Sequence, residues 1–236
     1  MINLNKISHY YGNKQVLENL SLEIEPNKIT SLLGGSGSGK TTILRIIAGL
    51  ENPQSGEVSI NSEVLTSNNE IIIPPNERNL GFIFQDLALW PHLSVFDNIA
   101  FGLKERKEND IKEKVYEILD YFGLKELSDK FPNQLSGGQK QLVAISRSLV
   151  MKPDILLMDE PLNNLDVKLK RRILDYIKRL KQEFNLTIIY VTHDHKEAFA
   201  ISDKVVVLQN GKIEETGKVE QIKQSNNEFV NYFLEY

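Results

Sequence analysis

The chain has 236 residues, of which 41% are hydrophobic and 25% charged, and a formal net charge of −4. This is the composition of a globular protein, and no apolar run approaches the roughly 20 residues that cross a membrane as a helix. The absence of cysteine excludes disulfides, thiolate metal sites and a cysteine nucleophile. The small acidic excess gives no reason to expect nucleic acid as a partner.

The first third of the chain is predicted to form mainly strands. Alternating or short apolar runs predict them at 2–10, 20–24, 28–33 and 80–84, and a hairpin at 57–65. Asn61-Ser62 is the expected turn of that hairpin. A helix is predicted from Lys40, because Ile43, Ile46, Ile47 and Leu50 recur on one face. Residues 67–79 are polar and contain Pro74-Pro75, which indicates a surface loop.

Helical periodicity begins at residue 94, where Ser94 and Asp97 have the spacing of a capping box. A second helix is predicted over 110–122, so that residues 86–150 form a helical insertion. Strands and helices alternate afterwards, with strands at 155–158, 186–192 and 204–209 and helices at about 137, 167–184, 194 and 219. This alternation predicts an α/β fold with a mostly parallel sheet, covered by helices on both faces.

A glycine-rich loop lies between the strand at 28–33 and the helix from Lys40. Residues 34–41 read GGSGSGKT, which fits the phosphate-loop pattern G-x-x-x-x-G-K-[ST] in its required strand–loop–helix context. A flexible Gly/Ser turn is the alternative interpretation. Lys40 is expected at the β- and γ-phosphates, Thr41 at Mg²⁺ and Thr42 at the α-phosphate, beside backbone N–H groups. The candidate phosphate-binding residues are Gly34, Gly35, Ser36, Gly37, Ser38, Gly39, Lys40, Thr41 and Thr42.

Two later apolar strands end in residues that suit phosphate chemistry. The strand at 155–158 is followed by Asp159 and Glu160, and the strand at 186–192 by His193. Parallel strands place their carboxyl ends at the ligand edge of the sheet. Asp159 is therefore a candidate Mg²⁺ ligand, Glu160 a candidate general base, and His193 a candidate γ-phosphate contact. A solvated acidic turn and a structural histidine are the alternatives. The other histidines, His9, His92 and His195, are expected to be structural or exposed.

A second glycine-rich helix start, Leu135-Ser136-Gly137-Gly138-Gln139, lacks a lysine and by itself is an ordinary N-cap. Together, however, the phosphate loop, Gln85, LSGGQ (135–139), LLMDE (156–160), NNLD (163–166) and THD (192–194) resemble, in order and spacing, ABC-transporter ATP-binding subunits. The resemblance covers essentially the whole chain. It implies a P-loop NTPase of the ABC cassette type at 1–236, with an N-terminal antiparallel β subdomain and the helical insertion.

The resemblance also implies roles for particular residues. Tyr11 matches the aromatic residue that stacks on adenine, although the adjacent Tyr10 could compete for that place. Gln85 matches the glutamine that senses Mg²⁺ and the attacking water and links the site to the membrane partner. Asp166 matches an aspartate that communicates across the subunit interface. Contact with the γ-phosphate held by the opposite subunit is implied for Ser136, Gly137, Gly138 and Gln139.

The implied function is hydrolysis of ATP, with Mg²⁺, to drive solute translocation. Two copies are expected to pack head to tail around two ATP molecules and to act on membrane permease subunits, with a solute-binding protein as an indirect partner. The expected location is the cytoplasmic face of the inner membrane, as a peripheral subunit. Nucleic acid is not an expected partner.

Residues 86–95, DLALWPHLSV, resemble the importer branch, in which this region forms a groove for a helix of the permease. Trp90 is either part of such a groove or a packing residue. The resemblance is to subunits for iron, polyamines, sulfate, molybdate, thiamine and sugars. Many of these continue into a β-rich regulatory domain, which we do not expect in this chain. An exporter ATPase and a non-transport ABC ATPase are the alternatives, and a kinase would have no use for LSGGQ.

Three positions depart from the family pattern. Leu142 stands where an arginine is usual, which puts any contact of that arginine in doubt. Gly35 replaces a frequent proline and His195 a common glutamine. None of them is assigned to the chemistry, so ATPase competence is still expected.

Overall fold

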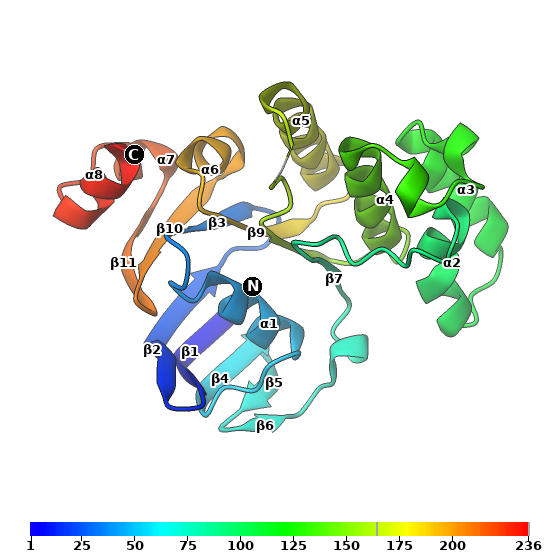
Figure 1. Ribbon diagram of the computed structural model, residues 1–236. Helices are drawn as coiled ribbons and strands as arrows, with labels where there is room; N and C mark the ends of the chain where they lie inside the picture. Colours follow the sequence, from blue (N-terminus) through cyan, green and yellow to red (C-terminus); the bar gives the residue numbers. More distant parts are fainter. Residues whose placement is uncertain (164, 236) are drawn as a thin grey trace.

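Two sheets organise the chain in the computed structural model, which describes residues 1–163 and 165–235 (Figure 1). Asn164, within the NNLD motif, and Tyr236 lie outside the described residues. The first sheet is antiparallel, with strand order β2-β1-β4-β5-β6. Its strands are β1 (Ile2–Tyr11), β2 (Lys14–Ile24), β4 (Ser55–Ile60), β5 (Glu63–Ser67) and β6 (Glu70–Ile71).

The second sheet has the order β11-β10-β3-β9-β8-β7, in which all neighbours run parallel except the edge strand β11. Its strands are β3 (Ile29–Leu33), β7 (Leu80–Ile83), β8 (Ile155–Asp159), β9 (Thr187–Thr192), β10 (Lys204–Gln209) and β11 (Lys212–Gly217). The helices are α1 (Lys40–Ala48), α2 (Val95–Glu105), α3 (Ile111–Tyr121), α4 (Gly137–Leu149), α5 (Val167–Glu183), α6 (His195–Ile201), α7 (Val219–Lys223) and α8 (Glu228–Glu235).

The parallel sheet is buried on both faces, which explains its uninterrupted apolar strands. In β10, Val206 and Leu208 pack on the side of α1 and the antiparallel sheet. Val205 and Val207 point to the opposite face and pack with Val219 and Val230 of the C-terminal helices. Figure 1 shows α5, α6, α7 and α8 above this sheet and α1 below it. The predicted α/β architecture with helices on both faces is therefore confirmed.

The three helices α2, α3 and α4 stand between β7 and β8 in the sequence, although these two strands are neighbours in the sheet. They form the green block beside the sheet in Figure 1, with Ile99, Leu119 and Val143 in their shared core. Ser94 caps α2, its side chain accepting a hydrogen bond from the backbone N–H of Asp97 at 3.0 Å. No helix in the described ranges is long and apolar enough to cross a membrane.

Most predicted elements occur in the structure, but β11 was not predicted. It alternates between partly buried and exposed residues and pairs with β10 through a turn at Asn210-Gly211, where φ is 47° and 78°. Asn-Gly is the strongest sequence signal for such a hairpin, so the signal was present. Strand β2 begins at Lys14 rather than at residue 20. The prediction missed its first residues because they are largely exposed and show little apolar pattern. The loop at 67–79 contains the short strand β6 and a 3₁₀ turn at Pro75–Glu77.

Candidate functional site

The glycine-rich loop leaves the carboxyl end of β3 and turns directly into α1. Gly37 and Gly39 have φ of 79° and 101°, a region that L side chains rarely adopt. A Cβ on Gly39 would also lie 2.6 Å from Cδ2 of Leu17. Glycine is therefore required for the backbone to wrap tightly here. The first N–H groups of a helix have no partner within the helix, so those of α1 are available to bind phosphate oxygens.

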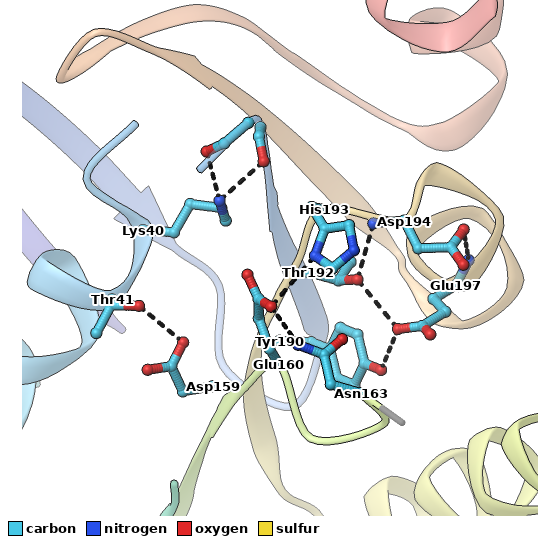
Figure 2. A network of polar contacts seen from close by, with 12 residues as sticks. Lys40, Thr41, Asp159, Glu160, Asn163, Tyr190, Thr192, His193, Asp194 and Glu197 are labelled. Carbon is cyan, nitrogen blue, oxygen red and sulfur yellow. Dashed lines mark hydrogen bonds and ion pairs between the residues drawn. The ribbon is translucent and has the colours of Figure 1, made fainter. Parts of the chain in front are cut away.

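Lys40 closes the loop with its side chain. Its Nζ donates hydrogen bonds to the carbonyl oxygens of Gly34 and Gly35, both at 2.8 Å (Figure 2). The residue is only 4% exposed. Burial lowers the pKa of Lys40, while the charges of Glu160 and Asp159 oppose that shift. A cationic group is thus held at the loop beside two carboxylates.

Asp159, the last residue of β8, is joined to the first turn of α1. Thr41 Oγ1 donates to Asp159 Oδ1 at 3.0 Å (Figure 2). Burial raises the pKa of Asp159, and the Thr41 hydrogen bond is the main opposing influence. A hydroxyl and a carboxylate in contact are oxygen ligands of the kind that Mg²⁺ prefers. The residues therefore fit the predicted cation.

Glu160 turns away from the strand toward His193. Its φ of 43° is the left-handed region, which is strained for a residue with a side chain. Its carboxylate Oε2 lies 3.2 Å from His193 Nδ1 and accepts a hydrogen bond from Asn163 Nδ2 (Figure 2). Its N–H donates to the carbonyl oxygen of Val191 at 3.0 Å. The ends of β8 and β9 thereby bring together the predicted general base, Glu160, and the predicted γ-phosphate contact, His193.

A cleft of about 380 Å³ lies over Lys40, Thr41 and Glu160, whereas Asp159 and His193 are not among the described residues that line it. Its lining includes Ser36, Gly37, Gly39, Lys40, Thr41, Thr42, Tyr11, Gln85 and Glu160. Gly34 and Gly35 instead contribute carbonyl groups to Lys40, and Ser38 is buried, with no partner for its Oγ within the described residues. Tyr11 is 43% exposed and packs edge-on against the buried His9, with ring centroids 4.7 Å apart. Among the described residues Tyr10 does not line the cleft, which favours Tyr11 as the aromatic base platform.

The LSGGQ segment lies elsewhere, at the start of α4. Ser136 Oγ accepts a hydrogen bond from the N–H of Gln139, and the Gln139 side-chain oxygen Oε1 accepts one from the N–H of Ser136, so both side chains cap the helix. A Cβ on Gly138 would lie 2.7 Å from Leu169, and one on Gly137 3.1 Å from Leu165. In the part of the chain that the structure describes, no residue of 136–139 lines the cleft.

Asp166 begins α5 as its N-cap, its Oδ1 accepting from the N–H of Leu169 at 2.9 Å. The contact between Gly138 and Leu169 places this helix start against the start of α4. Apart from Gly34, Gly35, Ser38 and His193, the residues predicted to contact ATP therefore fall into two groups. One group lines the cleft, and the other, from Ser136 to Gln139 with Asp166, lies at these two adjoining helix starts.

Trp90 is packed rather than free. It is partly buried, its ring lies 4.3 Å from that of Phe101 in α2, and the guanidinium of Arg147 in α4 lies 4.9 Å from its centroid. Arg147 also donates to the carbonyl oxygens of Leu87 and Ala88. These contacts hold the segment after Gln85 against the helical block. They support the packing interpretation of Trp90, while a groove beside it stays a prediction.

Sequence reasoning missed several residues around the site. Lys14 and Val16 line the cleft from β2, where no motif indicates them. Asn163 contacts the Glu160 carboxylate, and its position three residues later in the NNLD motif was the available signal. Glu197 and Tyr190 form a buried polar network behind His193, and nothing local in the sequence indicates it.

Comparison with known proteins agrees with this geometry. Residues 17–163 match the family model described as ABC transporter. The chain is 41% identical over 240 residues to the sulfate/thiosulfate import ATP-binding protein CysA of Pseudomonas putida, covering 99% of this chain and 71% of the relative. It is 43% identical to the Fe(3+) ions import ATP-binding protein FbpC of Photobacterium profundum, covering 98% and 65%. The Thermotoga maritima spermidine/putrescine import ATP-binding protein PotA is also 43% identical, covering 95% and 60%.

The fold is equally similar to solved structures. A dimeric structure of the ATP-binding cassette MJ0796 in a post-hydrolysis state, bound to ADP and Pi, has a TM-score of 0.82 and 32% identity. The match covers 93% of this chain and 99% of that one. The phosphate loop, the carboxylates that end β8 and this likeness over nearly the whole chain lead to one conclusion: the chain belongs to the ABC transporter family, as an ATP-binding cassette.

Proposed function

We propose that the chain is the ATP-hydrolysing subunit of an ABC importer. The observation that carries the proposal is the meeting of Lys40, Thr41, Asp159 and Glu160 at the carboxyl edge of one parallel sheet, with His193 against Glu160. Phosphates, a cation and an attacking water need a cationic, an oxygen-rich and a basic group side by side. The cleft over these groups contains all three.

The chain's own groups would divide the work of hydrolysis. The N–H groups of the loop and α1, with Lys40, hold the phosphate oxygens. Thr41, Asp159 and Gln85 would hold Mg²⁺, which when bound supplies positive charge beside the phosphates. Glu160 accepts a proton from the attacking water. His193, whose Nδ1 lies 3.2 Å from Glu160 Oε2, orients that water and contacts the γ-phosphate. Tyr11 stacks on the adenine.

We further propose that two copies complete each other's sites. Ser136, Gly137, Gly138, Gln139 and Asp166 lie at adjoining helix starts outside the cleft and are free to meet nucleotide on a second copy. A helix N-terminus with a hydroxyl is suited to a phosphate group. The related MJ0796 cassette is a dimer bound to ADP and Pi, which supports a dimer here, and we propose that its two copies pack head to tail.

The importer assignment rests on the relatives. The curated relatives are named import ATP-binding proteins for sulfate or thiosulfate, Fe(3+) and spermidine or putrescine. The chain spans between 60% and 71% of the length of these relatives, so the activity of the whole protein is a proposal. Permease subunits would be direct partners, contacted near residues 86–95 at the cytoplasmic face of the inner membrane, and a solute-binding protein an indirect one.

Hydrolysis is tested with Glu160→Gln, which keeps the shape of the side chain but removes its basicity. We expect Kd for ATP to change little and phosphate release to slow by roughly 10²–10⁴-fold, the usual contribution of a positioned base. The exposed Glu63→Gln on β5 is the matched control and should hydrolyse ATP at the wild-type rate. Undiminished turnover in Glu160→Gln would remove the base assignment.

The transport role is tested by partners. Permease subunits should co-purify with the chain from membranes and raise its ATPase rate. Stimulation by DNA or ribosomes instead would favour a non-transport ABC ATPase, and association with a solute-extruding membrane protein would favour an exporter.

A further inference from the structure

A buried carboxylate lies behind the site and takes no part in the proposed chemistry. Glu197, in the first turn of α6, is 5% exposed. Its Oε2 accepts hydrogen bonds from Tyr190 Oη at 2.8 Å and Thr192 Oγ1 at 3.0 Å, and its Oε1 accepts one from Lys170 Nζ at 2.7 Å. A buried charge persists only when it is paired and hydrogen-bonded in this way. Burial, followed by the charge of Glu197, raises the pKa of Tyr190 well above its ordinary value, so this hydroxyl stays a donor.

This carboxylate reaches the turn that carries His193 through one side chain. The Thr192 hydroxyl donates to Glu197 and also accepts from the N–H of Asp194 at 3.0 Å. Thr192 and Asp194 flank His193, so the backbone on both sides of the histidine is tied to the same group (Figure 2). Asp194 Oδ1 in turn accepts from the N–H groups of Lys196 and Glu197. The backbone that carries the exposed His193 ring is thus fixed by hydrogen bonds to buried or partly buried groups.

The same carboxylate reaches a second functional segment. Lys170 lies on α5 one turn after Asp166, and its ammonium pairs with Glu197 while only 24% exposed. The backbone N–H of Lys170 donates to the carbonyl oxygen of Asp166 at 2.9 Å. The helix start that adjoins Ser136–Gln139 is therefore linked, through one ion pair, to the turn that carries His193.

We propose that Glu197 is a positioning residue that holds His193 toward Glu160, and that its ion pair with Lys170 couples this position to the start of α5. The inference rests on the proposed ATP hydrolysis for its kinetic test. Asp166 and the start of α5 adjoin the LSGGQ residues that would meet a second copy. Binding of that second copy would therefore affect the position of His193 through the ion pair between Lys170 and Glu197.

A double-mutant cycle tests the first part. Glu197→Gln keeps the size of the side chain and should lower kcat about tenfold or more, with Kd for an ATP analogue within about twofold of wild type. In a His193→Ala background the same change should lower kcat by less than about twofold, because residues acting through one group are not additive. An equal loss of kcat in both backgrounds would overturn the proposal, because a structural effect that does not act through His193 lowers kcat by the same factor whether or not the histidine is present.

A matched pair at Thr192 gives a second readout that needs no ATPase activity. Thr192→Val removes the hydroxyl that joins Glu197 to the Asp194 N–H, whereas Thr192→Ser keeps it. The chain has 4 histidines, so the His193 imidazole signals are assignable by NMR from their loss in His193→Gln. We expect Thr192→Val and Glu197→Gln to shift these signals and Thr192→Ser to leave them in place. Unshifted signals in all three folded variants would refute the positioning role.

The link to α5 is tested at Lys170. Lys170→Met should shift the His193 signals and lower kcat, and Lys170→Arg, which preserves the ion pair, should restore both. Unchanged signals and kcat in Lys170→Met would remove the coupling. If wild-type protein lacks ATPase activity, the proposed function fails while the NMR comparison still decides the positioning role.

Discussion

At the residue scale, the two adjacent carboxylates that end β8 have different surroundings. Asp159 is 5% exposed and bonded to Thr41, whereas Glu160 turns through a left-handed backbone toward His193. A pair of acids in unlike environments is how one site obtains unlike chemical roles. The buried member is suited to a cation, and the member at the cleft to a water molecule.

The buried Asp159 carboxylate should lower the free energy of unfolding at neutral and alkaline pH, where it is ionised. Burial raises its pKa above that of the unfolded chain, so the folded state favours the protonated form. The stability contribution of this group is therefore present at low pH and lost as pH rises through the folded pKa. We expect Asp159→Asn to unfold at a higher temperature than wild type at pH 8, with the difference shrinking as the buffer is made acidic.

The measurement is thermal unfolding by circular dichroism across pH, with EDTA and no nucleotide. The exposed Asp120→Asn is the control and should show no such trend. A difference between Asp159→Asn and wild type that is independent of pH would contradict the assignment.

At the element scale, α1 is held at both ends, which fixes the phosphate loop. Its first turn is bonded to Asp159, and its last carbonyls, of Ile46 and Ile47, accept from Arg78 Nη1 at 3.2 and 2.8 Å. The other Arg78 nitrogens donate to Ile73, Leu65 and Thr66. Burial lowers the pKa of Arg78 to about 10. One guanidinium therefore joins α1 to β5 and to the loop at 67–79.

Replacing Arg78 should strongly destabilise the fold. Arg78→Met removes five hydrogen bonds that the guanidinium donates. Among the described residues it leaves the carbonyl groups of Ile47 and Ile73 without another donor, and hydrogen bonds to charged groups contribute about 1.5–3 kcal/mol each. We expect a loss of at least about 3 kcal/mol in the free energy of unfolding, measured by urea titration. Arg78→Lys should recover only part of it, because an ammonium lacks the planar fork of donors. The exposed Arg171→Met serves as control, and equal losses in both methionine variants would refute the account.

At the scale of the whole molecule, the candidate ATP contacts are split between the cleft and the adjoining starts of α4 and α5. A phosphate held only by the first group would leave the LSGGQ residues unused. Two copies related by a two-fold axis would give each cleft the missing half. In the proposed dimer, bound ATP would be part of the interface, and its hydrolysis would weaken that interface.

This arrangement predicts a dimer that depends on ATP. In Glu160→Gln, where hydrolysis is slow, light scattering should show the mass doubling when ATP and Mg²⁺ are added at micromolar protein. Adding Ser136→Glu should prevent it, because the new carboxylate would face the γ-phosphate. Ser62→Glu, at the exposed turn between β4 and β5, is the matched control. A monomer in Glu160→Gln at saturating ATP would exclude the shared site.

Local patterns in the sequence determined a large part of this protein. Several features depend only on near neighbours in the chain. They are the spacing of glycines before Lys40, the apolar runs that end at Asp159 and His193, and the capping residues Ser94 and Ser136. Their elements follow from backbone periodicity and hydrogen bonding. Strand β11 shows the limit, because an edge strand with one exposed face carries a weak apolar pattern even when its Asn-Gly turn is explicit.

Only the tertiary structure decided which of these residues meet. Periodicity does not encode strand order. The contact of Glu160 with His193 comes from the pairing of β8 with β9. The contacts of Glu197 with Lys170 and Thr192 come from the packing of α6 beside α5 and β9. It also decided that Trp90 packs on Phe101 and Arg147. The sequence by itself determined the chemistry available to this chain. The packing of two sheets around α1 determined which groups share the cleft and which lie at the helix starts outside it, because side-chain contacts between distant segments depend on how the elements pack.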